Sequence, residues 1–260
     1  MSGDSKWQPK APEFAKARYN KAMRRIWPWP IVLLEEIAAS MNDLHGGLWL
    51  DAGCGEGQLA DLTGKVRQVL GLDIDTTRLM RAKTHPYLSV VQGSVTSLPL
   101  AKESLSGIMC IQTLEHLLEM KAVLKEFYRC LRPDGYLLIS MPSVTLRSLW
   151  QMNRSQRPVY CSRQEHIREL SSVPISGFPN RFKTWEWLER CMSQSGFKKI
   201  RQGGVGYLFP MWSGKWAWLE HIMNILYREK FNRLIGRLPV VRNYPYYCFF
   251  LFRRKNLSSS

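Results

Sequence analysis

Three glycines that alternate with other residues follow a short apolar segment near position 50, and an aspartate stands just before them. The stretch reads Leu50-Asp51-Ala52-Gly53-Cys54-Gly55-Glu56-Gly57. Glycines at this spacing let the backbone turn tightly and approach a ligand without obstruction by side chains. A carboxylate beside the turn favours a ligand with an amino group or another positive charge, and it would repel a pyrophosphate. The loop therefore predicts a site for a small cationic ligand.

A second carboxylate, Asp73, ends the next apolar segment, 16 residues after Gly57. An acidic side chain at the end of that strand can accept hydrogen bonds from both hydroxyls of a ribose. The alternative is a nicotinamide or flavin dinucleotide site, which usually has the spacing GxGxxG and rests its pyrophosphate on a helix N-terminus. The spacing here is GxGxG, with Asp51 at the end of the strand, and the charge of that carboxylate favours a ligand that combines a ribose with a cationic group.

Short apolar segments that alternate with helical segments must position these residues. Helical patterns are expected at 117–131 and at 185–195, and a turn at 133–135. Strands are expected at 48–50, 69–72, 88–91, 108–111, 136–139, 197–203 and 246–252. This alternation predicts a parallel sheet with helices on both faces.

The 260 residues are enough for one large α/β domain with additions to it. Two helical patterns, separated by Trp27-Pro28-Trp29-Pro30, predict an N-terminal helical cap over residues 1–45. We expect the main domain at 46–260. Its ligand-binding half would be 46–142 and its basic half 143–260, and the basic half would contain an aromatic helical insertion at about 207–245.

The order of the motifs resembles that of the class I S-adenosylmethionine-dependent methyltransferases, of the kind that act on small molecules and lipids. The resemblance runs from about residue 46 to 142. It rests on LDAGCGEG at 50–57, GLDID at 71–75, QGSV at 92–95 with Leu98-Pro99, CIQTLEH at 110–116 and LRPDGYL at 131–137. It implies a Rossmann-like α/β fold with a mainly parallel seven-stranded sheet, and S-adenosyl-L-methionine as the cofactor.

The resemblance also implies a role for each matching position. The loop that would surround the methionine part of the cofactor consists of Asp51, Ala52, Gly53, Cys54 and Gly55. Asp73 would hold the ribose, and Ile74 would pack on the adenine. Ser94 and Val95 would border the adenine edge, although the family often has aspartate where Ser94 stands. Gln112 would lie beneath the sulfonium end.

Methyl transfer depends mainly on positioning, and a hydroxyl acceptor would also benefit from a general base. His116 follows the fourth expected strand, and the alternative is that it caps or packs the next helix. His166 lies in Glu165-His166-Ile167-Arg168, which resembles a family segment that borders the acceptor pocket. A surface position is the alternative for His166. We expect His166 and Arg168 to face the acceptor, with Arg168 binding an anionic group.

The net charge of +16 is distributed unevenly. Residues 46–140 contain 10 basic and 10 acidic residues, whereas residues 141–260 contain 20 basic and 6 acidic ones. Such asymmetry favours an anionic partner, which can be phosphate, acidic lipid or nucleic acid. The six cysteines are scattered without a CxxC pair, which argues against a metal site and a disulfide framework. We expect a cytoplasmic protein.

Aromatic and basic residues are interleaved between 207 and 245, a composition typical of an element that lies on a membrane surface. Simple packing on the domain is the alternative. We favour a small-molecule, glycan or lipid-linked anionic acceptor, with peripheral contact to an anionic membrane. RNA is a second possibility because of the basic half, and a non-catalytic protein of the same fold is a third. The oligomeric state is not readable from the sequence.

Overall fold

The computed structural model describes most of the region that carries the motifs. The described residues are 46–57, 68–117, 119–142, 185–205 and 247–256, with single positions at 33, 36, 37, 40, 41, 44, 59, 238 and 245. His166, Arg168 and almost all of the aromatic segment 207–245 lie outside the described residues. Within the described part, no helix is both long and apolar enough to cross a bilayer.

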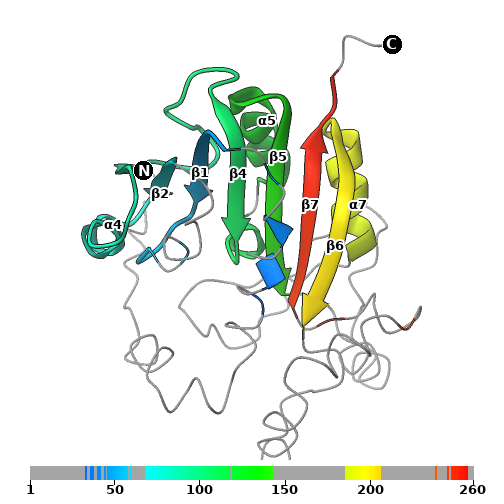
Figure 1. The fold of residues 1–260 in the computed structure, drawn as a ribbon, viewed down its shortest axis with the longest axis horizontal. Coiled ribbons are helices and arrows are strands. Elements are labelled where there is room, and N and C mark those ends of the chain that lie inside the picture. Colours follow the sequence, from blue (N-terminus) through cyan, green and yellow to red (C-terminus); the bar gives the residue numbers. More distant parts are fainter. Residues whose placement is uncertain are drawn as a thin grey trace, which may run out of the picture.

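Seven strands form one sheet in the order β3-β2-β1-β4-β5-β7-β6. Strands β1 to β5 all run parallel to one another, and β7 is antiparallel to both β5 and β6. Figure 1 shows β7 (red) between β5 and β6 and running against both. The strands are β1 Leu48–Ala52, β2 Gln68–Asp73, β3 Ser89–Gln92, β4 Leu105–Ile111, β5 Leu131–Pro142, β6 Phe197–Val205 and β7 Tyr247–Arg254. The predicted mainly parallel, seven-stranded α/β sheet is confirmed.

Helices connect several of these strands. The described ones are α4 Thr76–Ala82, the short 3-10 helix η2 Leu114–His116, α5 Met120–Cys130 and α7 Trp185–Gln194. The single helix expected at 117–131 is therefore shorter and is preceded by η2. The helix expected at 185–195 is confirmed, and Gly196 ends it with a φ of +87°, which other residues rarely adopt.

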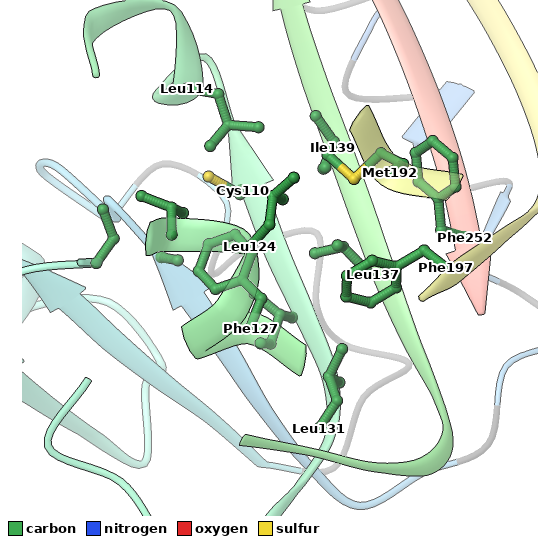
Figure 2. Packing of buried hydrophobic residues seen from close by; sticks show 14 of the residues in the cluster. Cys110, Leu114, Leu124, Phe127, Leu131, Leu137, Ile139, Met192, Phe197 and Phe252 are labelled. Atoms are coloured by element: carbon green, nitrogen blue, oxygen red, sulfur yellow. The ribbon is translucent and has the colours of Figure 1, made fainter. Parts of the chain in front are cut away.

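The two faces of the sheet bury separate apolar clusters because side chains alternate along each strand. On β5, Leu137 and Ile139 face the larger cluster, which α5 and α7 cover with residues such as Phe127 and Met192. Figure 2 shows these side chains packed between the two helices and the sheet. Leu138 faces the second cluster, on the opposite side.

Residues of the expected N-terminal cap contribute to that second cluster. Leu33 and Ile37 are helical and buried there together with Trp49 of β1 and Phe249 of β7. Apolar side chains thus cover both faces of the sheet, as a doubly wound fold requires. The expected boundary at residue 45 stays a prediction.

The turn expected at 133–135 before the fifth strand is wrong in detail, because β5 already begins at Leu131. Leu105 of β4 pairs with Leu131, and the next paired residue, Gly107, faces Tyr136. Residues 132–135 therefore form an irregularity inside β5, in which Asp134 has a φ of 62°. The sequence could not indicate that β4 pairs with β5 both before and after residues 132–135.

A buried arginine at the end of β7 fastens that strand to the beginning of β5. The guanidinium of Arg254 donates to the Leu131 carbonyl and, over 3.0 Å, to Oε1 of Glu103. It also lies 4.3 Å from the centre of the Tyr128 ring. Charge, hydrogen bonding and cation–π contact therefore hold one end of the pair β5–β7.

Candidate cofactor-binding site

The glycine loop leaves β1 at the carboxyl edge of the parallel strands and folds over the end of β2. The amides of Gly53 and Cys54 both donate to the Leu72 carbonyl, at 2.7 and 2.9 Å. Gly53 and Gly55 have φ values of +83° and +55°, in the left-handed region that favours glycine. The loop is thus a tight turn at the place where ligands bind in open α/β sheets.

Asp73 ties this loop to the end of β2. Its Oδ2 accepts from the Gly55 amide at 2.8 Å, and its Oδ1 accepts from the Asp75 amide at 2.9 Å. The side chain is 9% exposed, and each oxygen keeps a second acceptor direction. Asp73 can therefore hold the loop and bind two hydroxyls at once, and its role with a ribose stays a prediction.

Gly53 and Gly55, the first two glycines of the loop, have different surroundings. A methyl group added at Gly53 would lie 2.4 Å from Oγ1 of Thr113, whereas one added at Gly55 would meet no atom of the described residues within 4 Å. Gly53 is therefore needed for close packing against the segment after β4. Gly55 borders open space among the described residues, and the methionine part of the expected cofactor would need that space.

Asp51 is the most unusual charge of the site. It is 1% exposed, its Oδ2 accepts a hydrogen bond of 2.6 Å from the Tyr87 hydroxyl, and its Oδ1 has no partner in the described structure. Burial raises the pKa of Asp51 to about 7, the Tyr87 hydrogen bond opposes that rise, and the charge of Asp73 adds to it. A buried carboxylate oxygen without a partner fits a cationic group.

The residues expected around the adenine follow Asp73 and β3. Ile74 is 67% exposed, which is high for a large apolar side chain and suits packing against a flat ring. Ser94 is turned to its own loop, where its Oγ lies 2.7 Å from the Thr96 hydroxyl and accepts from the Thr96 amide. Val95 buries its side chain in the core, so any ligand contact there would come from its backbone.

Gln112 stands immediately after β4 in a left-handed conformation, with a φ of 54°, which is uncommon for a residue other than glycine. Two contacts to Ser140 of β5 hold it: its amide donates to the Ser140 carbonyl at 2.8 Å, and its Nε2 donates to Ser140 Oγ at 3.1 Å. Strain of this kind concentrates at functional sites. The structure thus keeps Gln112 at the same strand edge as the glycine loop.

His116 ends η2, and its Nε2 lies 4.0 Å from Oε1 of the buried Glu115. Its backbone amide donates to the Thr113 carbonyl, and Thr113 abuts Gly53. The segment 112–116 and the glycine loop are therefore in contact. Ala52 and Cys54 are buried, so both loop residues can reach a ligand through their backbone only.

Sequence reasoning missed two residues of this site, Tyr87 and Thr113. Tyr87 lies 36 residues after the aspartate that it contacts, outside every motif. Thr113 lies inside the fourth-strand motif, yet only the structure shows that its side chain limits the size of residue 53. No spacing pattern would have indicated either contact.

A family model described as a methyltransferase domain matches residues 50–139. A probable S-adenosylmethionine-dependent methyltransferase of Mycolicibacterium smegmatis is 40% identical over 97 residues, which cover 36% of this chain and 37% of that protein. A sterol methyltransferase-like protein of Botryococcus braunii is 24% identical over 74% of this chain and 49% of its own. A ubiquinone biosynthesis O-methyltransferase of Haemophilus ducreyi is 29% identical over 43% and 52%, respectively. The chain thus spans about a third to a half of the length of these relatives.

Solved structures share the fold over almost the whole chain. An S-adenosylmethionine-dependent methyltransferase of Thermotoga maritima has a TM-score of 0.59 at 15% identity and covers 94% of this chain and 98% of its own. The magnesium protoporphyrin IX methyltransferase of Synechocystis, solved with bound S-adenosylhomocysteine, has a TM-score of 0.58 at 16% identity and covers 94% of both chains. At such identity the likeness concerns the fold.

Proposed function

Because this chain carries a methyltransferase domain of the class I S-adenosylmethionine-dependent family, we propose that it transfers a methyl group to a small-molecule, glycan or lipid-linked acceptor. The observation that carries the proposal is the glycine loop, which combines open space at Gly55 with two carboxylates, Asp51 and Asp73. A ligand with a cationic end and a ribose matches that combination. A dinucleotide does not, because its pyrophosphate would meet Asp51.

The residues present fit S-adenosyl-L-methionine. Asp51 and the backbone of Gly53 and Gly55 would hold the methionine part, Asp73 the ribose hydroxyls and Ile74 the adenine. When bound, the cofactor supplies a methyl group on a positively charged sulfur, which is already activated for displacement. The chain's own task is then to hold the acceptor in line and to exclude water, and such positioning can lower a barrier by several kcal/mol, roughly 7–11 at its best.

A hydroxyl acceptor also needs a place for its proton. His116 would accept that proton, and the Glu115 carboxylate 4.0 Å away would stabilise the charge that the imidazole gains. His166 and Arg168, which lie outside the described residues, would face the acceptor, with Arg168 on an anionic group. We expect the double variant His166→Ala with Arg168→Ala to lose most transfer activity while it binds the cofactor normally. Unchanged transfer would remove both residues from the proposal.

The first test is a calorimetric titration of the folded protein with S-adenosylmethionine and S-adenosylhomocysteine, followed by transfer of a labelled methyl group. We expect binding in the micromolar range, and then transfer to lipid-linked or phosphorylated acceptors. Binding without transfer to any acceptor would favour a non-catalytic protein of this fold. A folded protein that binds neither compound would contradict the proposal.

Two observations favour a lipid-like acceptor at a membrane surface. Relatives are named for sterol methylation and for ubiquinone biosynthesis, which concern apolar acceptors. Residues 141–260 have 14 more basic than acidic side chains. Several described cations are already paired, for example Lys199 with Glu189 at 2.8 Å and Arg253 with Asp134 at 3.2 Å. We therefore expect other basic residues of 141–260 to contact the lipid headgroups.

We expect the protein to co-sediment with vesicles that contain anionic phospholipid and to remain in solution with neutral phosphatidylcholine vesicles. Bound protein should dissociate as salt is raised toward about 0.5 M, because screening shortens the range of the attraction to a few ångströms. The variant with Lys230→Gln and Arg233→Gln should bind more weakly, and Lys102→Gln, in the neutral half, should not. Equal binding to both vesicle types would contradict the electrostatic contact, and tight binding to tRNA would favour an RNA acceptor.

A further inference from the structure

Tyr87 reaches from the segment between α4 and β3 to the end of β1. Its hydroxyl donates to Oδ2 of Asp51 over 2.6 Å, a short distance that is usual for bonds to a charged oxygen. The ring is partly buried against two apolar clusters, and the Tyr87 amide donates to the His85 carbonyl. Ring and backbone are both held, so the hydroxyl is a fixed donor.

The Asp51 carboxylate is left with one satisfied and one unsatisfied oxygen. Oδ1 is buried and has no hydrogen-bond partner in the described part of the chain. Asp73 repels the charge of Asp51. Burial raises the pKa of the Cys54 and Cys110 thiols, and the charge of Asp51 adds to that rise. Burial and the charge of Asp73 raise the pKa of Asp51, the Tyr87 hydrogen bond opposes the rise, and none of the three supplies a positive charge.

We propose that Tyr87 is a positioning residue for the cofactor, which fixes one oxygen of Asp51 so that the other accepts the ammonium group of the methionine part. This inference rests on the proposed function. Without the tyrosine hydroxyl, the carboxylate would be free to rotate about its terminal bond and would lose its only described hydrogen bond. Neutral Asp51 would then be favoured further, because a hydrogen bond to the charged form is what opposes the effect of burial.

The arrangement couples cofactor binding to a proton. The pKa of Asp51 is about 7 in the free protein, so a large fraction of the carboxyl groups are protonated at neutral pH. An ammonium group binds the carboxylate, so binding drives that proton into the solvent. Affinity should therefore rise as pH rises toward and past 7, and it should be about tenfold weaker at pH 6 than where Asp51 is fully ionised.

The test compares Tyr87→Phe with the unaltered protein by calorimetry between about pH 5.5 and 8.5, in buffers of different ionisation enthalpy. We expect Tyr87→Phe to bind S-adenosylhomocysteine about tenfold more weakly at pH 7, with the midpoint of the pH dependence moved upward. Asp51→Asn should bind weakly at every pH and release no proton. Tyr136→Phe is the matched control, because Tyr136 is also partly buried against the second cluster, and it should change nothing.

A separate readout on the free protein follows the Asp51 carboxyl carbon by NMR as pH is changed. Its titration midpoint should rise in Tyr87→Phe. A uniform loss of affinity at all pH values, with an unmoved midpoint, would mean a merely structural role and overturn the inference. Binding by Tyr87→Phe that equals that of the unaltered protein would overturn it as well. If the unaltered folded protein binds no cofactor, the proposed function itself fails, and the positioning role with it.

Discussion

Replacement of Asp73 by alanine is expected to weaken S-adenosylhomocysteine binding by about a hundredfold or more. The variant loses the acceptor for the ribose. It also loses two backbone hydrogen bonds, from the amide of Gly55 in the glycine loop and from the amide of Asp75. Hydrogen bonds to a charged group contribute about 1.5–3 kcal/mol each. The loss of two such bonds to the ribose hydroxyls corresponds to about two powers of ten or more in affinity. Calorimetry measures the dissociation constant directly.

Two variants separate the loss of charge from a general effect. Asp73→Asn keeps the volume and one acceptor oxygen, so we expect an intermediate affinity. Asp134→Ala removes an exposed aspartate whose described partner is Arg253, at the far end of β5. It should bind like the unaltered protein. Full affinity of a folded Asp73→Ala variant would contradict the assignment of the ribose to Asp73.

Gly55→Ala should mainly weaken cofactor binding, whereas Gly53→Ala should mainly lower the stability of the fold. At Gly55 a methyl group meets no atom of the described part of the chain within 4 Å, so the left-handed backbone is what opposes it there, at about 1–2 kcal/mol of unfolding free energy. Its methyl group would nevertheless occupy space that the cofactor needs. We therefore expect Gly55→Ala to fold, to melt a few degrees lower and to bind the cofactor at least tenfold more weakly.

Gly53→Ala should mainly lose stability. Its methyl group would lie 2.4 Å from Oγ1 of Thr113, and the φ of +83° is unfavourable for alanine. Overpacking and backbone strain together should lower the free energy of unfolding by roughly 3 kcal/mol. Thermal and urea unfolding measure this loss, and Thr113→Ala in the same chain should recover the overpacking part. Equal stability of Gly53→Ala and Gly55→Ala would contradict the described packing.

The elements with strong local signals could be predicted from sequence. Strands β1, β2 and β4 are apolar segments bounded by polar turns, and their positions were right to within three residues at each end. The antiparallel strand β7 was also expected from its run of aromatic residues. Its antiparallel direction and its place between β5 and β6 were not predicted, because strand order depends on contacts between distant segments.

The parts of the site that could not be predicted are contacts across long sequence separations. The Tyr87 hydroxyl bonds an aspartate 36 residues away, and the two contacts of Gln112 are to Ser140. The excursion at 132–135 depends on the pairing of Leu105 with Leu131, which has no local signal. Residue types indicated which side chains could bind a ligand or transfer a proton. Which of these side chains lie close together depends on the pairing of the strands in the sheet.

The position of β7 has a consequence for the order in which the protein can fold during synthesis. This strand is made after the other six, yet it lies between β5 and β6 and is fastened to Leu131 and Glu103 by Arg254. Until it emerges from the ribosome, β5 has an open edge of unpaired amides and carbonyls, and β6 has no neighbour in the sheet. The parallel strands β1 to β5 therefore keep an unpaired edge, which favours aggregation, until residues more than a hundred positions further along the chain have been synthesised.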